Sequence, residues 1–303
     1  IKNLKKNRYH PMLKSRLPNK LNILDYKFLK SELKKNYNYV VLAVSSKGID
    51  WVIEKLVKNY VKKYYLIVLT KGLSIYKNKI INILNKINLE FQRKGLPIQN
   101  ITSIKGPCLA VGLINKVRTS TVIANQSISV ASQVSRIIST SYYTTEVTKD
   151  IIGVEILGAI KNIYAMLIGA SVGLSGSKLK ENIRLKYFHN TSSVLFRKSL
   201  NEMEIFTKKM NGNPKTAYGL AGLGDLYVSI VGGRNSRMGY YLGKGKKYLN
   251  IKNKEMKNIT TEGCDLAIEI GPTIQKKFKR KDFPLMFSLI DSICKNKKLK
   301  IKW

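Results

Sequence analysis

The stretch Gly153–Ser175, GVEILGAIKNIYAMLIGASVGLS, is almost wholly apolar or small and carries only two formal charges, Glu155 and Lys161. An apolar run of about 20 residues is long enough to cross a bilayer as a helix. A charged side chain at mid-membrane is costly, however, by about 2.5–3.5 kcal/mol on insertion scales. The stretch therefore favours a buried helix of a soluble domain, with glycines that permit close contact with neighbouring elements.

Within this helix, Lys161 and Asn162 would lie against an interior wall or a cleft. Lysine is almost never fully buried unless it is paired or has a chemical task. Alternatively, the aliphatic part of Lys161 packs on the core while its ammonium group reaches solvent. The residues of the stretch leave these two interpretations open.

Upstream of this stretch, apolar runs alternate with amphipathic segments, a pattern typical of parallel α/β folds. We expect strands at 39–46, 64–70, within 100–107, at 120–125 and at 141–148, and helices at 50–62, 75–87 and 130–140. From Asp150 onward the strand signals stop and long helical patterns follow. We therefore predict an α/β domain with a doubly wound parallel sheet in residues 1–149 and an all-α domain in residues 150–303.

The charge of the chain is extreme, since 55 Lys and Arg against 18 Asp and Glu give a formal net charge of +37 over 303 residues. Such a charge favours polyanionic partners, among them nucleic acids and anionic membranes. Lysine is nevertheless spread over the whole chain, and Asn, Ile and Tyr are also abundant. This joint excess indicates AT-rich codon usage, so we expect no specific nucleic-acid partner.

Cysteine and histidine give no sign of a metal site. Cys108, Cys264 and Cys294 are far apart and fit neither a zinc spacing nor a disulfide framework, and the two histidines are isolated. No apolar signal-peptide segment lies near Ile1. We therefore expect a protein of the reducing cytoplasm.

Four segments carry a resemblance to a known family. They are TKGL (Thr70–Leu73), KGPCLA (Lys105–Ala110), the central stretch GVEILGAIKNIYAMLIGASVGL, and GLAGLGDLYVSIVGGRNSRMG (Gly219–Gly239). In this order they resemble the motifs of NAD-dependent glycerol-3-phosphate dehydrogenases. The resemblance implies a Rossmann-like domain followed by a helical one, NAD or NADP as cofactor, and interconversion of dihydroxyacetone phosphate and sn-glycerol 3-phosphate for phospholipid synthesis. It leaves the oligomeric state open, with a homodimer as one alternative.

The resemblance also implies catalytic roles for three residues. Lys161 is expected to be the proton donor and acceptor, which requires a lysine pKa lowered by burial or by a neighbouring cation. Lys71 is expected to contact substrate and cofactor, and its charge would help to lower the pKa of Lys161. Asp225, in GLGDL, would hold Lys161 or a substrate hydroxyl.

Further binding roles follow from the same resemblance. Arg234 and Asn235 match the pair that grips the substrate phosphate, next to Gly233 at the opening of a helix. The remaining expected contacts are Gly106, Cys108 and Asn162 for the substrate, and Ala110, Arg234, Thr260 and Glu262 for the cofactor. Two departures weaken this transfer, because Cys108 replaces a serine and Val111-Gly112 replaces a polar pair.

No Gly-x-Gly-x-x-Gly turn follows a strand in the 303 residues, although a dinucleotide-binding fold uses such a turn to hold the pyrophosphate. We therefore expect the Rossmann-like domain to be incomplete at its N-terminal side, with an unpaired apolar edge on the strand at 39–46. The choice between NAD and NADP stays open, since the residue that reads the ribose belongs to that part of the fold. The alternative to an active enzyme is a truncated or decayed, non-catalytic descendant of the family.

Overall fold

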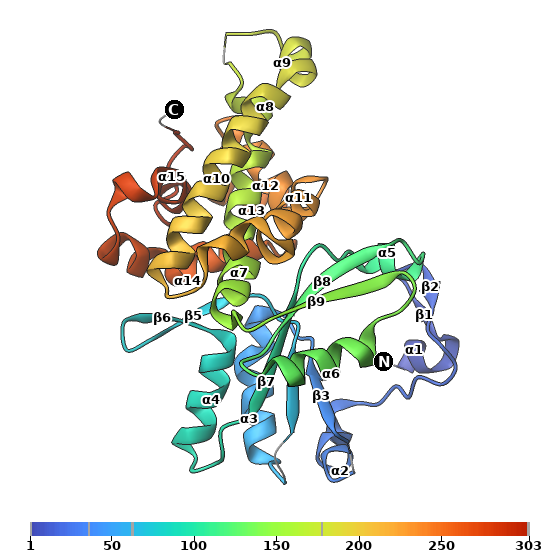
Figure 1. Ribbon diagram of the computed structural model, residues 1–303. Coiled ribbons are helices and arrows are strands. Elements are labelled where there is room, and N and C mark those ends of the chain that lie inside the picture. Colours follow the sequence, from blue (N-terminus) through green and yellow to red (C-terminus); the bar gives the residue numbers. More distant parts are fainter. Residues whose placement is uncertain (1, 36, 62–63, 177, 302–303) are drawn as a thin grey trace.

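The computed structural model describes residues 2–35, 37–61, 64–176 and 178–301. The chain forms a sheet-containing half and a helical half, which meet where helix α7 (Ile151–Gly169) approaches the sheet (Figure 1). No strand occurs among the described residues after β9 (Tyr143–Thr148), in agreement with the expected change from α/β to helical structure. A domain boundary near Asp150 remains a proposal.

The sheet of the first half has five strands in the order β3-β4-β7-β8-β9. Its other members are β3 (Tyr39–Leu42), β4 (Tyr65–Val68), β7 (Asn100–Lys105) and β8 (Thr119–Ala124). The pairs β3–β4, β4–β7 and β8–β9 are parallel, but β7 and β8 are antiparallel. The prediction of a wholly parallel sheet is therefore wrong at this pair. The connection between these two strands contains only the short helix α5 (Ala110–Ile114).

Helices cover both faces of the sheet (Figure 1). Leu66 and Val68 of β4 pack with α3 (Ile49–Lys58) and α4 (Ile83–Arg93), whereas Ile67 packs with α6 (Ile128–Ile138). Successive strand residues point to opposite faces, so a continuous apolar run suits a strand that is covered on both sides.

The helix expected at 75–87 is wrong in its first half. Strands β5 (Leu73–Tyr76) and β6 (Lys79–Asn82) form an antiparallel hairpin there, and α4 begins only at Ile83. Lys77 and Asn78 join the two strands with positive φ angles of 46° and 60°. A two-residue turn with both φ angles positive matches the twist of a hairpin, so the turn and the Ile-rich flanks prevail over helical periodicity.

Strand β3 lies at one edge of the five-stranded sheet, as expected. Its Val41 is 53% exposed. The residues before β3 form α1 (Lys2–Asn7), a separate hairpin of β1 (Tyr9–His10) and β2 (Ser15–Arg16), and α2 (Leu29–Leu33). None of the strands described in residues 2–35 and 37–61 pairs with the outer edge of β3.

Helix α7 is the centre of the helical half. All of its residues from Gly153 to Ile168 are buried. The surrounding helices are α8 (Ser171–Leu174), α9 (Glu181–Tyr187), α10 (His189–Lys209), α11 (Asp225–Ile230), α12 (Arg234–Gly243), α13 (Tyr248–Asn253), α14 (Glu262–Lys277) and α15 (Pro284–Cys294). Although α7 is long and apolar enough to cross a membrane, its burial makes it the core helix of this half.

Glycines allow α12 to approach α7 and α8 closely. A Cβ atom on Gly239 would lie 1.8 Å from the carbonyl oxygen of Met166, and one on Gly173 would lie 2.1 Å from the carbonyl carbon of Gly243. No side chain fits at such distances, so the two backbones are in direct contact. The C-terminal part of α7, the helix that carries Lys161, therefore packs directly against the backbone of α12.

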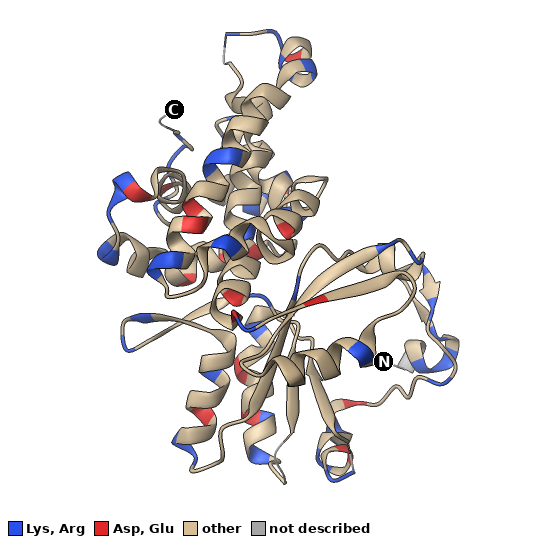
Figure 2. Cartoon of the chain, viewed as in Figure 1, with Lys and Arg blue, Asp and Glu red and all other residues tan. Residues whose placement is uncertain are grey.

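Lys and Arg residues occur on helices and loops of both halves (Figure 2). One local concentration lies near the C-terminus, in a hollow of about 930 Å³ whose basic lining residues are Lys247, Arg280, Lys281, Lys295, Lys297, Lys298 and Lys300. Elsewhere the positive charge is dispersed, as the distribution of lysine along the sequence suggests.

Candidate active site

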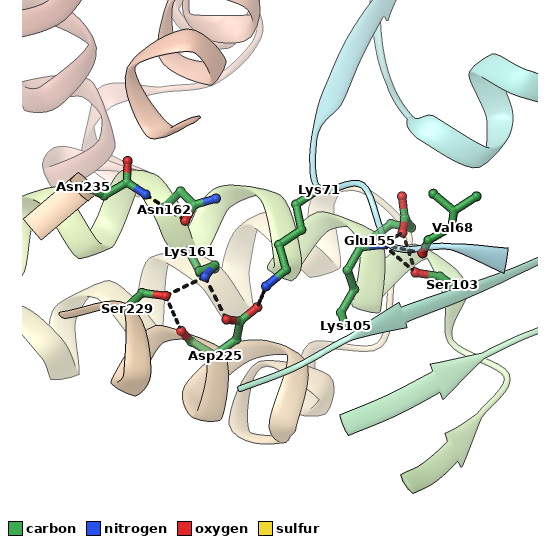
Figure 3. A network of polar contacts seen from close by, with 10 residues as sticks. All are labelled: Val68, Lys71, Ser103, Lys105, Glu155, Lys161, Asn162, Asp225, Ser229 and Asn235. Carbon is green, nitrogen blue, oxygen red and sulfur yellow. Dashed lines mark hydrogen bonds and ion pairs between the residues drawn. The ribbon is translucent and has the colours of Figure 1, made fainter. Parts of the chain in front are cut away.

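The expected catalytic residues meet where the carboxyl edge of the sheet faces the helical half (Figure 3). Lys71 follows β4, Lys161 lies on α7, and Asp225 is the first residue of α11. The carboxyl ends of strands are where ligands of α/β folds bind. Tertiary structure thus brings together three residues from different elements.

Asp225 connects the two lysines. Its Oδ1 accepts a hydrogen bond from Lys161 Nζ at 2.7 Å, and its Oδ2 accepts one from Lys71 Nζ. The carboxylate is only 2% exposed, whereas the Lys71 side chain is 25% exposed. Lys161 also donates to Ser229 Oγ, which itself donates to the backbone oxygen of Asp225 at 2.6 Å. Charge-assisted bonds of this kind are among the stronger hydrogen bonds of proteins.

The ammonium group of Lys161 is buried and paired, so the interpretation in which it reaches solvent is wrong. Burial and, after it, the positive charge of Lys71 lower the pKa of Lys161 from 10.5 to about 8, against the opposing effect of Asp225. A lysine with a pKa near 8 exchanges its proton readily near neutral pH. The arrangement therefore suits proton transfer to and from a bound oxygen.

The loop after β7 also faces the site. Gly106 has a φ of +137°, and a Cβ atom there would lie 3.1 Å from the backbone of Thr121. Pro107 packs on Gly224, directly before Asp225. Cys108 is half-buried, and burial raises the pKa of its thiol. The loop thus lies beside the Lys71–Asp225 pair, although its substrate contacts remain a prediction.

Arg234 and Asn235 begin α12 after the N-cap residue Gly233. The guanidinium of Arg234 lies 3.0 Å from Glu262, and these side chains are 56% and 42% exposed. Asn235 is buried, donates to Asn162 Oδ1 at 2.9 Å, and accepts from the backbone of Gly263 at 3.0 Å. The structure thus leaves Arg234 accessible and gives Asn235 protein partners that link α7, α12 and α14.

Two expected cofactor residues lie on the surface. Ala110 begins α5, and Thr260 lies two residues before α14, and both are exposed. Their cofactor role, like that of Arg234 and Glu262, remains a prediction.

Sequence reasoning missed Ser229 and a buried cluster formed by Ser103, Lys105 and Glu155. Ser229 lies four residues after Asp225, and this helical spacing places both side chains on one face of α11. Lys105 and Glu155 form an ion pair of 2.6 Å beside the site. No spacing signal links two residues so far apart in the chain.

Comparisons with known proteins agree with these motifs. The family model described as NAD-dependent glycerol-3-phosphate dehydrogenase N-terminus matches residues 2–131, and the corresponding C-terminus model matches residues 150–302. The NADP(+)-dependent glycerol-3-phosphate dehydrogenase of Archaeoglobus fulgidus is 32% identical over 248 residues, which span 81% of this chain and 70% of that protein. The glycerol-3-phosphate dehydrogenase [NAD(P)+] of Clostridium tetani is 30% identical over 74% of this chain and 59% of its own length.

A solved structure supports the same fold. The crystal structure of glycerol-3-phosphate dehydrogenase from Coxiella burnetii matches with a TM-score of 0.77 at 23% identity, over 98% of this chain and 85% of that one. The resemblance based on four motifs and the expected fold class are therefore confirmed.

Proposed function

Because this chain belongs to the NAD-dependent glycerol-3-phosphate dehydrogenase family, we propose that it interconverts dihydroxyacetone phosphate and sn-glycerol 3-phosphate. The observation that carries this proposal is the buried Lys161, hydrogen-bonded to Asp225 and with a pKa of about 8. The product would supply the backbone of phospholipids. The proposed site of action is the cytoplasm, where free cysteines persist.

The described residues suit the nicotinamide end of a nicotinamide dinucleotide. The nicotinamide, when bound, supplies or accepts the hydride. The loops that contain Lys71 and Gly106 lie at the carboxyl edge of the sheet, where that ring would lie next to Lys161. The pyrophosphate end has no matching Gly-x-Gly-x-x-Gly turn in the 303 residues. We therefore assign no residue to the pyrophosphate.

Lys161 would move the proton. In ketone reduction its ammonium group donates a proton to the oxygen of dihydroxyacetone phosphate as that oxygen becomes a hydroxyl. In the reverse direction the neutral amine takes the proton back. Asp225 holds Lys161 at 2.7 Å and also accepts from Lys71. The charge of Lys71 would stabilise negative charge developing on the substrate oxygen.

Arg234 would bind the substrate phosphate. Its guanidinium is exposed at the N-terminus of α12, where unpaired backbone N–H groups also attract anions. Its present partner Glu262 is exposed as well, so the pair can separate at little cost. Asn235 would act indirectly, by holding Asn162 in place beside Lys161.

The Lys161→Met variant of the full-length protein tests the proposal. We expect kcat to fall at least about 10²-fold, since general acid–base catalysis contributes about 10²–10⁴. Cofactor affinity should change little. Lys208→Met, on the exposed surface of α10, is the matched control and should leave kcat unchanged. If kcat survives in Lys161→Met, Lys161 is a packing residue and this mechanism is wrong.

A further inference from the structure

Lys105 and Glu155 form an ion pair with both side chains 0% exposed, and the proposed chemistry does not use it. Lys105 Nζ lies 2.6 Å from Glu155 Oε1, and it also donates to Ser103 Oγ at 2.9 Å and to the backbone oxygen of Val68 at 3.2 Å. The ammonium group thus has one ion-pair partner and two hydrogen-bond acceptors (Figure 3).

Such a pair contributes little to stability by itself. Removing two ions from water is costly, and replacing a buried ion pair by apolar residues is often neutral or stabilising. Here burial lowers the pKa of Lys105 despite the adjacent carboxylate, and Glu155 Oε2 has no hydrogen-bond partner among the described residues. The pair therefore calls for a role other than stabilisation.

The contacts of Lys105 join three segments that carry the proposed site. Val68 ends β4, three residues before Lys71. Lys105 itself ends β7, directly before the Gly106–Cys108 loop. Glu155 lies on α7, as Lys161 does.

The fit around the lysine stem is tight as well. A Cβ atom on Gly158 would lie 3.0 Å from Lys105 Cδ, so α7 passes directly against this side chain.

We propose that Lys105 and Glu155 are positioning residues that fix the carboxyl edge of the sheet against α7 and thereby hold Lys71 on Asp225 next to Lys161. The proposal rests on the proposed function. Apolar contacts alone are not directional, whereas an ammonium group held by an ion pair and two hydrogen bonds has a defined position. Misplacement of a reacting group by about 1 Å can lower the rate about 10²-fold.

The decisive variant is the double substitution Lys105→Met/Glu155→Leu, which removes both charges and keeps an apolar filling of similar volume. Single substitutions would leave one buried charge unpaired and confuse the result. We expect a thermal midpoint at or above that of the unaltered protein, together with a kcat about 10²-fold lower and a smaller change in KM. A double variant with the thermal midpoint and the kcat of the unaltered protein would overturn the proposal.

A second readout is independent of turnover. The rate at which an amine-specific reagent modifies Lys161, followed by mass spectrometry as a function of pH, reports the pKa of this lysine in the unliganded protein. The charged groups that act on Lys161 are Lys71, Asp225 and Glu262. If Lys71 leaves Asp225, its lowering effect weakens, so the modification midpoint should rise above about 8 in the double variant. An unchanged midpoint would overturn the proposal.

Two further variants complete the experiment. Lys244→Met/Glu181→Leu removes a partly exposed ion pair with a distance of 2.8 Å in the helical half. It should change neither the pH midpoint of Lys161 modification nor kcat. Should the first double variant fail to fold, Glu155→Asp keeps both charges but shortens the carboxylate side chain that reaches Lys105. It should raise the pH midpoint of Lys161 modification in the same way. If it does not, the pair has no positioning role. Absence of turnover in the unaltered full-length protein would refute the proposed function alone, since the modification experiment needs neither substrate nor cofactor.

Discussion

Substitution of Asp225 by Asn should shift the pH dependence of catalysis. The amide has nearly the shape of the carboxylate but removes the negative charge that accepts from both Lys161 and Lys71. Two ammonium groups would then lie next to each other without a counter-ion. Because this carboxylate is 2% exposed, solvent does little to replace it.

The size of the shift follows from the contact distance. An opposite charge within about 4–6 Å commonly changes a pKa by about 1–3. Asp225 raises the pKa of Lys161, so its loss should lower that pKa below the present value of about 8. A fall of about two would leave roughly one tenth of Lys161 protonated at pH 7. Ketone reduction, which needs the protonated lysine, would slow about tenfold at pH 7 from this effect alone.

Initial rates of NADH oxidation by dihydroxyacetone phosphate, measured from pH 5 to 10 on the full-length protein, would reveal the shift. The unaltered enzyme should be active below a midpoint near 8 and lose activity as the pH rises through it. Asp291→Asn is the matched control, because Asp291 also forms ion pairs with two cationic side chains, Arg280 and Lys295, but plays no proposed catalytic role. A midpoint in Asp225→Asn that equals that of the unaltered enzyme would refute the reasoning.

Two other outcomes are expected. Arg234→Ala should raise KM for sn-glycerol 3-phosphate about 10- to 100-fold, since loss of a charged hydrogen bond costs about 1.5–3 kcal/mol. Because the Arg234 side chain is exposed, we expect a value near the lower end of this range. Equal losses for glycerol and its phosphate ester would show that Arg234 does not bind phosphate. Gly239→Ala should destabilise the fold in urea by about 1–3 kcal/mol through overpacking against Met166, whereas Gly112→Ala, with its nearest neighbour atom 3.8 Å away, should not.

The sequence by itself identified the central helix and the main elements around it. An apolar run with one lysine and one glutamate indicates a buried soluble helix, and α7 is buried from Gly153 to Ile168. Strands β3 and β4 were recognisable because apolar runs bounded by polar or glycine residues suit a sheet covered on both faces. The motifs around Lys71, Lys161 and Asp225 also pointed to the residues that meet in space.

Local pattern failed where a turn or a neighbouring strand decides the structure. The Ile-rich segment after Lys71 is compatible with a helix or a hairpin, and only the left-handed turn at Lys77-Asn78 selects the hairpin. The antiparallel pairing of β7 with β8 likewise cannot be read from the pattern of either strand by itself.

Tertiary structure alone decided the electrostatics of the site. The pKa of Lys161 depends on its burial and on the charge of Lys71. Lys71 is held by Asp225, which lies 154 residues after it in the chain. The contact of Ser103 with Glu155 spans 52 residues, and no periodicity records it. Desolvation and Coulomb interactions depend on distances in space, whereas sequence periodicity reports only on contacts within one helix or strand. A sequence can therefore indicate which lysine is unusual, but only the fold determines how strongly its proton is held.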